Sequence, residues 1–264
     1  MRGRLWLGLP LLLAACSNST SGGLLQVPYS IGGPQFADGG ALQFTTARGW
    51  NVTLQAAKID LGPFYFNIDP PNTSEFRDGV VIVEALKQVT LDLLDPTLVP
   101  VPGGAQGELG TAIAVEIDLL PPDPTITDPD VAGPTDTSSA FFSGLATGPA
   151  DAGMLVPFQG WITIDQSLAS ESTPLPWLQR VNGAVCALDF SSDQQSLTLR
   201  VDPTSWFDTA DFSELPGNGS GGGANPGDGG PYGWDEASNF HLAVLGQIQA
   251  TTGVYAFALS GDGG

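Results

Sequence analysis

The chain has 264 residues, of which 42% are hydrophobic, and its 28 Asp and Glu against 8 Lys and Arg give a formal net charge of −20 at pH 7. A nucleic-acid binder needs a basic surface, and a protein that crosses the bilayer several times needs several apolar runs of roughly 20 residues. Both classes are therefore excluded. Aromatic and aliphatic residues occur along the whole chain, which predicts a folded protein with a sizeable core.

The first segment of the chain, residues 1–15, has the pattern of a signal peptide. Two arginines precede an apolar stretch that is too short to span a bilayer, and two alanines supply small residues for cleavage. The residues Leu13-Ala14-Ala15-Cys16 resemble the bacterial lipobox. The resemblance implies that a diacylglyceryl group is attached to the sulfur of Cys16, that the signal peptide is removed, and that acyl chains such as palmitate anchor the protein.

Residues 16–24 are predicted to form a flexible, lipidated tether, because a run of Ser, Asn, Thr and Gly favours no regular structure. The residue after the cysteine is Ser17, which resembles the pattern of lipoproteins that are sorted to the outer membrane. We therefore expect a cell-envelope protein that contacts the membrane through its lipid and faces the periplasm or the cell surface. The acidic surface makes nucleic acid and anionic membrane surfaces poor partners.

Residues 25–264 are predicted to form a mainly β, antiparallel sandwich, either as one domain or as a domain with two lobes. Segments rich in β-branched and aromatic residues, several of them alternating in polarity, are bounded by Gly, Pro, Asn or Asp. These segments are 52–54, 58–61, 80–83, 89–93, 112–119, 158–164 and 197–201. Two long loops are predicted: the Pro- and Asp-rich segment 121–139 and the Gly-rich segment 216–231.

One short helix is predicted near the C-terminus. Apolar residues recur there at helical spacing, after a candidate capping residue and before a glycine. The apolar residues of this pattern are Phe240, Val244, Leu245 and Ile248, with Asp235 or Ser238 as the candidate cap and Gly253 as the candidate end. A final strand over residues 254–259 follows. If this strand closes a sheet that begins much earlier in the chain, the C-terminus has a structural role and the Gly-rich loop only bridges the gap.

The chain has few side chains suited to catalysis. His241 is its only histidine, and its position in the predicted helix favours a buried or surface role over a catalytic one. Cys186 is the only thiol left once Cys16 is acylated, and its apolar neighbours favour a buried, unreactive side chain. The Gly-x-Ser-x-Gly motif of serine hydrolases is absent. We therefore predict that the protein is not an enzyme.

The segment 202–212 combines three carboxylates with aromatic side chains, directly after a predicted strand. Asp202, Asp208 and Asp211, together with His241, are candidate metal ligands, and carboxylate oxygens suit Ca²⁺. Alternatively, Asp208 and Asp211 act as the acid and base of a hydrolase. The interpretation that we favour is structural: the aspartates cap a turn and a short helix, while the aromatic residues fill the end of the sandwich.

Residues 49–54 (GWNVTL), followed by residues 62–66 (GPFYF), resemble the strand pattern that opens the MbnP-like periplasmic copper-binding lipoproteins. Phe207-Asp208 also has a counterpart in that family. The resemblance implies a copper site, which in the family relies on histidine and a modified tryptophan. In this chain only His241 can serve, and no tryptophan is matched, so calcium is favoured over copper as a bound metal.

The leading hypothesis is a membrane-anchored, non-enzymatic lipoprotein whose β-domain binds a ligand or has a structural part in the envelope. The first alternative is a metal-binding module, for Ca²⁺ or less readily for copper, and the second is a carboxylate-dependent hydrolase. No cofactor other than Ca²⁺ is expected. Four tryptophans, Trp50, Trp161, Trp177 and Trp234, either pack into the core or form a face on which sugar rings stack.

Overall fold

The structure is a computed structural model, and it describes residues 24–37, 39–120, 138–149, 154–164, 168–170, 173–217 and 230–261. The predicted signal peptide, Cys16 and most of the predicted tether lie outside the described residues, as do most residues of the two predicted loops. The predicted fold class is confirmed, because the chain is mainly β, with three sheets and two α-helices among the described residues.

The largest sheet has six strands and is antiparallel throughout. Its order is β1 (Leu25–Val27), β9 (Ala105–Gly107), β6 (Val80–Ala85), β5 (Phe64–Asp69), β10 (Gly110–Asp118) and β13 (Arg180–Phe190). The ladder between β10 and β13 is interrupted by register shifts, so a strict alternation of buried and exposed residues is lost there.

The second sheet has four strands and combines segments from both ends of the chain. Its order is β15 (Tyr255–Ser260), β14 (Ser196–Val201), β2 (Tyr29–Gly32) and β8 (Val99–Pro100). The pairing of β14 with β2 is parallel, and that of β14 with β15 is antiparallel. The final strand therefore completes a sheet that begins at Tyr29.

The third sheet has five strands. Its order is β12 (Leu155–Thr163), β11 (Ser138–Thr147), β4 (Asn51–Leu61) and β3 (Leu42–Thr45), and β7 (Val89–Asp92) pairs with the far end of β4. The two short strands predicted at residues 52–54 and 58–61 are thus parts of one long strand. A register shift between Ser143 and Gly144, opposite the middle of β4, separates them.

The six-stranded and four-stranded sheets pack face to face as a sandwich. Tyr29 on β2 meets Phe64 and Phe66 on β5 edge-on, with ring centroids 5.2 and 5.9 Å apart. Phe257 on β15 meets Phe66 at 6.0 Å in the same geometry. Edge-to-face packing of this kind stabilises aromatic pairs beyond the area that they bury.

Short helices cover the inner face of the five-stranded sheet. They are α2 (Asn239–Ile248) and the 3₁₀ helices η2 (Pro203–Phe207) and η3 (Phe212–Gly217), and all three contribute to an aromatic cluster on this face. The other α-helix, α1 (Leu175–Leu178), lies beside β13 of the six-stranded sheet. Phe142 on β11 meets Phe207 at 5.0 Å, and Phe212 meets both Phe158 on β12 and Phe240 on α2 within 5.1 Å. The predicted helix is confirmed, with Ser238 as its N-cap.

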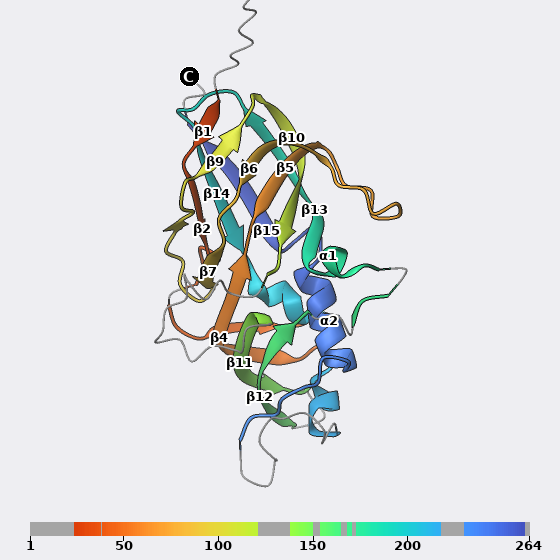
Figure 1. Ribbon diagram of the computed structural model, residues 1–264. Coiled ribbons are helices and arrows are strands. Elements are labelled where there is room, and N and C mark those ends of the chain that lie inside the picture. The colour runs from red at the N-terminus through yellow and green to blue at the C-terminus, as the bar shows by residue number, and fades with distance from the viewer. Residues whose placement is uncertain are drawn as a thin grey trace, which may run out of the picture.

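Figure 1 shows how these layers are arranged. β1 and the end of β15 lie together at the upper end of the sandwich, whereas the five-stranded sheet and α2 form the lower half. One contiguous hydrophobic core runs through both halves.

The boundaries of the two predicted loops differ from the structure. β11 begins at Ser138, inside the segment predicted as a loop, because Ser138 pairs with Thr163 and the Ser139 hydroxyl donates to the Leu119 carbonyl at 2.7 Å. At the other loop, η3 extends through Gly217. Local composition predicts loop residues in both places, but hydrogen bonds to distant parts of the chain decide the ends of the elements.

Candidate functional site

The segment after β14 has the structural role that we favoured from the sequence. The Asp202 side chain accepts hydrogen bonds from the Thr204 backbone N–H at 2.9 Å and from the Thr204 hydroxyl at 2.7 Å, and so caps η2. Trp206 and Phe207, which follow in η2, are fully buried, as is Phe212 in η3. Asp202 therefore stabilises the start of η2, and the three aromatic rings pack into the core of the lower half.

Asp208 and Asp211 both bind the turn between β3 and β4. Asp208 accepts a hydrogen bond from the Ala47 backbone N–H at 3.2 Å, and Asp211 forms an ion pair with Arg48 at 3.1 Å. Partial burial raises the pKa of Asp211, but hydrogen bonds from Ser213 and the nearby Arg48 guanidinium outweigh it and hold that pKa below its ordinary value. Both carboxylates are therefore engaged in packing η2 and η3 against the sheet.

His241 lies in the interior of the lower half, where α2 packs against η2 and the five-stranded sheet. It is fully buried, and neither ring nitrogen meets the geometry of a hydrogen bond. Burial lowers its pKa to about 4, although the nearby carbonyls of Glu236 and Thr163 act in the opposite direction. The imidazole is therefore neutral at physiological pH and does not face solvent.

The four predicted metal ligands do not form one cation site. Among the described residues, no group of three or more His, Cys, Asp or Glu is close enough to hold a metal ion, and His241 is separated from solvent. These residues consequently do not fit the copper site that the sequence resemblance implies. Calcium binding stays a prediction from the sequence.

Cys186 on β13 is partly buried and its thiol lies 3.5 Å from the Ala112 carbonyl. Burial raises the pKa of this thiol to about 12. Because the thiolate is the reactive form of cysteine, Cys186 is protonated and unreactive at neutral pH.

The four tryptophans singled out in the sequence do not share a face. Trp50 packs against Phe212 at 5.5 Å, Trp177 on α1 meets Phe76 at 5.5 Å, and Trp234 stacks on Phe142 at 4.9 Å. Only Trp161 projects from the outer face of the five-stranded sheet, with 39% of its surface exposed.

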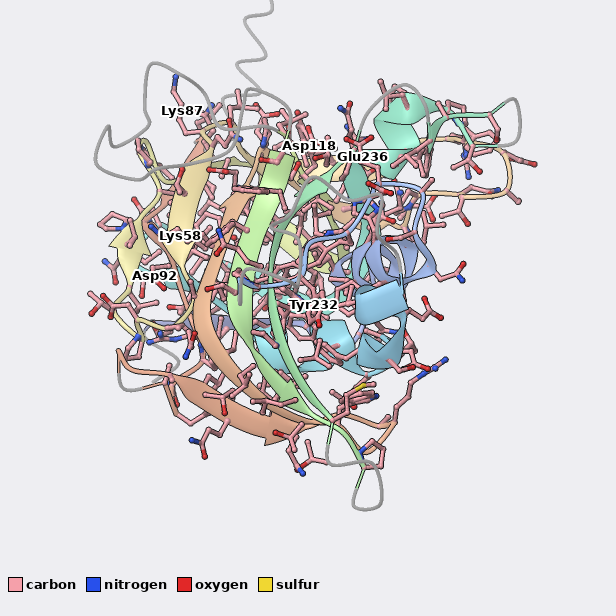
Figure 2. The ribbon with its side chains drawn as sticks, turned by 90° about the horizontal axis from the view of Figure 1, so that it is seen from below. Lys58, Lys87, Asp92, Asp118, Tyr232 and Glu236 are labelled. Carbon is pink, nitrogen blue, oxygen red and sulfur yellow. The ribbon has the colours of Figure 1, made fainter. Side chains whose placement is uncertain are left out.

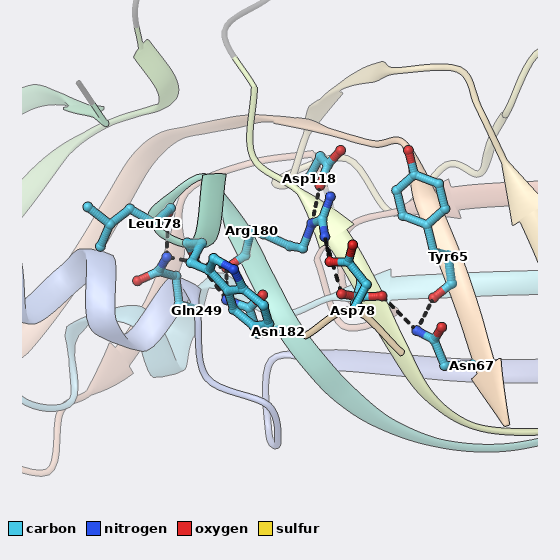
Figure 3. Close-up of polar contacts among 10 residues, drawn as sticks. Tyr65, Asn67, Asp78, Asp118, Leu178, Arg180, Asn182 and Gln249 are labelled. Carbon is cyan, nitrogen blue, oxygen red and sulfur yellow. Dashed lines mark hydrogen bonds and ion pairs between the residues drawn. The ribbon is translucent and has the colours of Figure 1, made fainter. Parts of the chain in front are cut away.

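Among the described residues, the side chain that forms the most ion pairs was not predicted from the sequence. Arg180, at the start of β13, forms ion pairs with Asp118 at 2.6 Å, Asp78 at 2.9 Å and Glu116 at 3.2 Å, and its guanidinium lies 5.5 Å from the centre of the Tyr65 ring. Figure 3 shows Asp118 and Asp78 converging on this guanidinium. We call these five residues the Arg180 cluster.

The Arg180 cluster has three carboxylates for one guanidinium. Glu116 is only 1% exposed, and burial raises its pKa while Arg180 and a hydrogen bond from Asn67 act to lower it. Burial also raises the pKa of Asp118, and Arg180 acts to lower it. The cluster joins β10, β13 and the connection between β5 and β6, with Glu116 enclosed and Asp78 largely exposed. Two acidic residues in an otherwise apolar strand, 112–119, were the sequence signal for it.

A row of side chains crosses the outer face of the five-stranded sheet. Trp161 on β12 is paired with Phe141 on β11, Phe141 with Lys58 on β4, and Lys58 with Asp92 on β7. Directly opposed residues in antiparallel strands point to the same face. Figure 2 labels Lys58 and Asp92 on the side of the sheet away from α2. We call this row the Trp161 row.

Comparison with models of known protein families and with curated proteins gives no match. Among solved structures, MbnP from Methylosinus trichosporium is similar at 11% identity and a TM-score of 0.32, with 90% of this chain and 98% of that chain covered. At this identity and TM-score, the similarity assigns no function. Among the described residues, no helix is both long and apolar enough to cross a bilayer.

Proposed function

We propose that the protein is a lipid-anchored, non-enzymatic lipoprotein of the cell envelope whose β-domain binds a ligand through the lower half of the molecule. The lipobox at Cys16 supports the anchor. The poor reactivity of His241 and Cys186, which are both shifted toward their neutral forms by burial, supports a binding role over catalysis.

The observation that carries this proposal is the position of the two ends of the molecule. β1 begins directly after the predicted tether, at the upper end of the sandwich, and the five-stranded sheet lies at the opposite end (Figure 1). A lipid on Cys16 would therefore hold the upper end near the membrane and direct the five-stranded sheet away from it. A surface far from the anchor is free to meet a ligand.

The anchor is tested by metabolic labelling with radioactive palmitate. The chain has two cysteines, so each provides the control for the other. We expect Cys16→Ala to abolish labelling and to release the protein from the membrane fraction, and Cys186→Ala to leave both unchanged. Label that persists in Cys16→Ala would contradict the proposed anchor.

A further inference from the structure

We propose that the outer face of the five-stranded sheet is a binding face for a neutral polysaccharide, with Trp161 and Phe141 as the stacking platform. This inference rests on the proposed ligand-binding function and specifies its ligand class and its site. It does not depend on the lipid anchor.

The platform consists of two aromatic rings on adjacent strands. The ring centroids of Phe141 and Trp161 are 5.4 Å apart and their planes are inclined by 44°. The rings thus present a twisted apolar surface. The apolar face of a sugar ring packs on such a surface, while its hydroxyl groups remain free for hydrogen bonds.

The surroundings of the platform supply those hydrogen bonds. Next to Trp161 and Phe141, the following row on the same face contains Gln159, Ser143 and Ala56, which oppose one another in register. Gln159 is exposed and Ser143 is partly exposed. An amide and a hydroxyl each donate and accept hydrogen bonds, which suits sugar hydroxyl groups.

Four consecutive register rows of the face carry no net charge, although the protein is strongly acidic; Asp60, in the next row beside Lys58, is only 7% exposed. The outward positions in four consecutive register rows carry one cation, Lys58, and one carboxylate, Asp92, while the chain as a whole has a net charge of −20. The remaining positions are Leu155, Thr147, Asn51, Thr45, Pro157, Leu145, Thr53, Gln43, Gln159, Ser143, Ala56, Trp161 and Phe141. A ligand without charge fits a face without net charge.

Charge also favours a neutral polysaccharide over an anionic polymer or a second copy of the chain as the ligand of this face. An anionic polymer would be repelled by the rest of the surface. A second copy of the chain would bring two strongly negative molecules together, at a cost that the one lysine and one aspartate of this face would not offset. A neutral polysaccharide incurs neither cost.

The outer edge of β12, which carries Trp161, is held by hydrogen bonds with the segment around Tyr232 and Trp234. The indole N–H of Trp234 donates to the Trp161 carbonyl at 2.9 Å, and a Cβ at Gly160 would lie 2.5 Å from the Trp234 ring. Tyr232 exchanges two backbone hydrogen bonds with the outer edge of β12, through Pro157 and Gln159. The edge of β12 is thus closed at this point, and the platform is held in place before any ligand arrives, which limits the entropy lost on binding.

The test is affinity electrophoresis of the full-length protein, purified in a polyoxyethylene detergent that has no sugar headgroup. The gels contain laminarin, hydroxyethylcellulose, dextran, galactomannan or, as the anionic polymer, alginate. We expect at least one neutral polysaccharide to retard the wild-type protein and Trp161→Ala to weaken that retardation at least tenfold. Trp161→Phe should restore part of it, because a ring is retained.

Trp177→Ala is the matched control, since Trp177 is a partly exposed tryptophan on α1, away from this sheet. It should bind like the wild type, and unchanged melting temperatures would show that Trp161→Ala remains folded.

The proposal is wrong if the wild type is not retarded by any neutral polysaccharide, if only alginate retards it, or if Trp161→Ala binds like the wild type. A dimer in sugar-free buffer that Trp161→Ala dissociates would also overturn it. Palmitate labelling of Cys16 is independent of all these results.

Discussion

Arg180 on β13 and Asp118 on β10 are directly paired across an antiparallel ladder, and the guanidinium Nε donates to the Asp118 carboxylate at 2.6 Å. Glu116, two residues earlier on β10, is almost completely enclosed and forms an ion pair with the same guanidinium at 3.2 Å. A carboxylate in this position is tolerated because Arg180 compensates its charge. The six-stranded sheet therefore depends on the ion pairs of Arg180 at a position where the neighbouring residues of β10 are apolar.

The first prediction concerns this contact. Arg180→Gln leaves the enclosed Glu116 without a positive partner, and removing one member of a buried ion pair destabilises by about 3–5 kcal/mol. We expect a loss of about that size in the free energy of unfolding, measured by urea denaturation. Arg48→Gln is the matched control, because the ion pair of Arg48 with Asp211 has 51% and 31% of its two side chains exposed and should contribute less than ~1 kcal/mol. Equal effects of the two variants would contradict the structural importance of Arg180.

The second prediction concerns pH and two buried groups with opposite shifts. The folded-state pKa of His241 is lowered to about 4, so its contribution to stability is complete above its unfolded value near 6.5 and is lost as the pH falls toward 4. The pKa of Asp60 on β4 is raised to about 6 by burial, against a smaller effect of its hydrogen bond from Thr90. Its contribution is complete below the unfolded value near 3.8 and is lost as the pH rises through 6. Between pH 4 and 6 the two contributions oppose each other.

Asp60→Asn removes one of the two opposing contributions and can still accept the hydrogen bond from Thr90. Between pH 6.5 and 4 this variant should itself lose about 3 kcal/mol of stability, because His241 then acts alone, whereas the wild-type stability should stay nearly constant because the Asp60 contribution offsets that of His241. His241→Gln should change in the opposite direction over the same range. Denaturation curves at each pH measure both differences, and parallel pH profiles for the three proteins would show that neither group is shifted.

The third prediction concerns the aromatic cluster of the lower half. Phe142 stacks on Trp234 at 4.9 Å and meets Phe207 at 5.0 Å, so Phe142→Ala should leave a cavity and destabilise by about 3–5 kcal/mol. Leu242→Ala on α2, where the side chain is 47% exposed, should change stability by less than ~0.5 kcal/mol. If urea denaturation gave Phe142→Ala the same stability as wild type, the lower half would not be packed as described.

The fourth prediction separates the capping role of Asp202 from metal binding. Asp202→Ala removes the acceptor for both Thr204 donors and should cost about 1 kcal/mol. A ligand of the native state raises the melting temperature, so millimolar Ca²⁺ should leave the melting temperature of the wild type unchanged if Asp202, Asp208 and Asp211 serve only in packing. A rise that Asp208→Ala abolishes would instead support the calcium site predicted from the sequence.

Local patterns were sufficient for much of the fold. Alternation along 197–201 predicts β14, whose burial alternates strictly, and helical spacing after Ser238 predicts α2. β13 was missed because Gly183 has a φ of 93° and register shifts break the alternation along its pairing with β10. A pattern that is read from one strand cannot show an irregularity imposed by its partner.

The candidate sites also differ in how far they could be predicted from local sequence. The capping role of Asp202 depends on Thr204, two residues further along the chain, and agrees with the prediction. Cys186 was predicted to be buried but is only partly buried, and its thiol contacts the distant Ala112 carbonyl. The Arg180 cluster and the Trp161 row join residues far apart in the sequence through strand register. Register between distant strands depends on the packing of the whole sandwich, so neither group could be derived from sequence patterns alone.

The central claim is that Trp161 on the outer face of the five-stranded sheet meets the ligand. The most direct test is ¹⁹F NMR of protein labelled with 5-fluorotryptophan, titrated with the neutral polysaccharide that retards the wild type in gels, with Trp161→Phe and Trp177→Phe used to assign the two resonances. We predict that the Trp161 resonance shifts on titration while those of the buried Trp50 and Trp206 and of Trp177 stay in place. A Trp161 resonance that stays unchanged at saturating polysaccharide would contradict the claim.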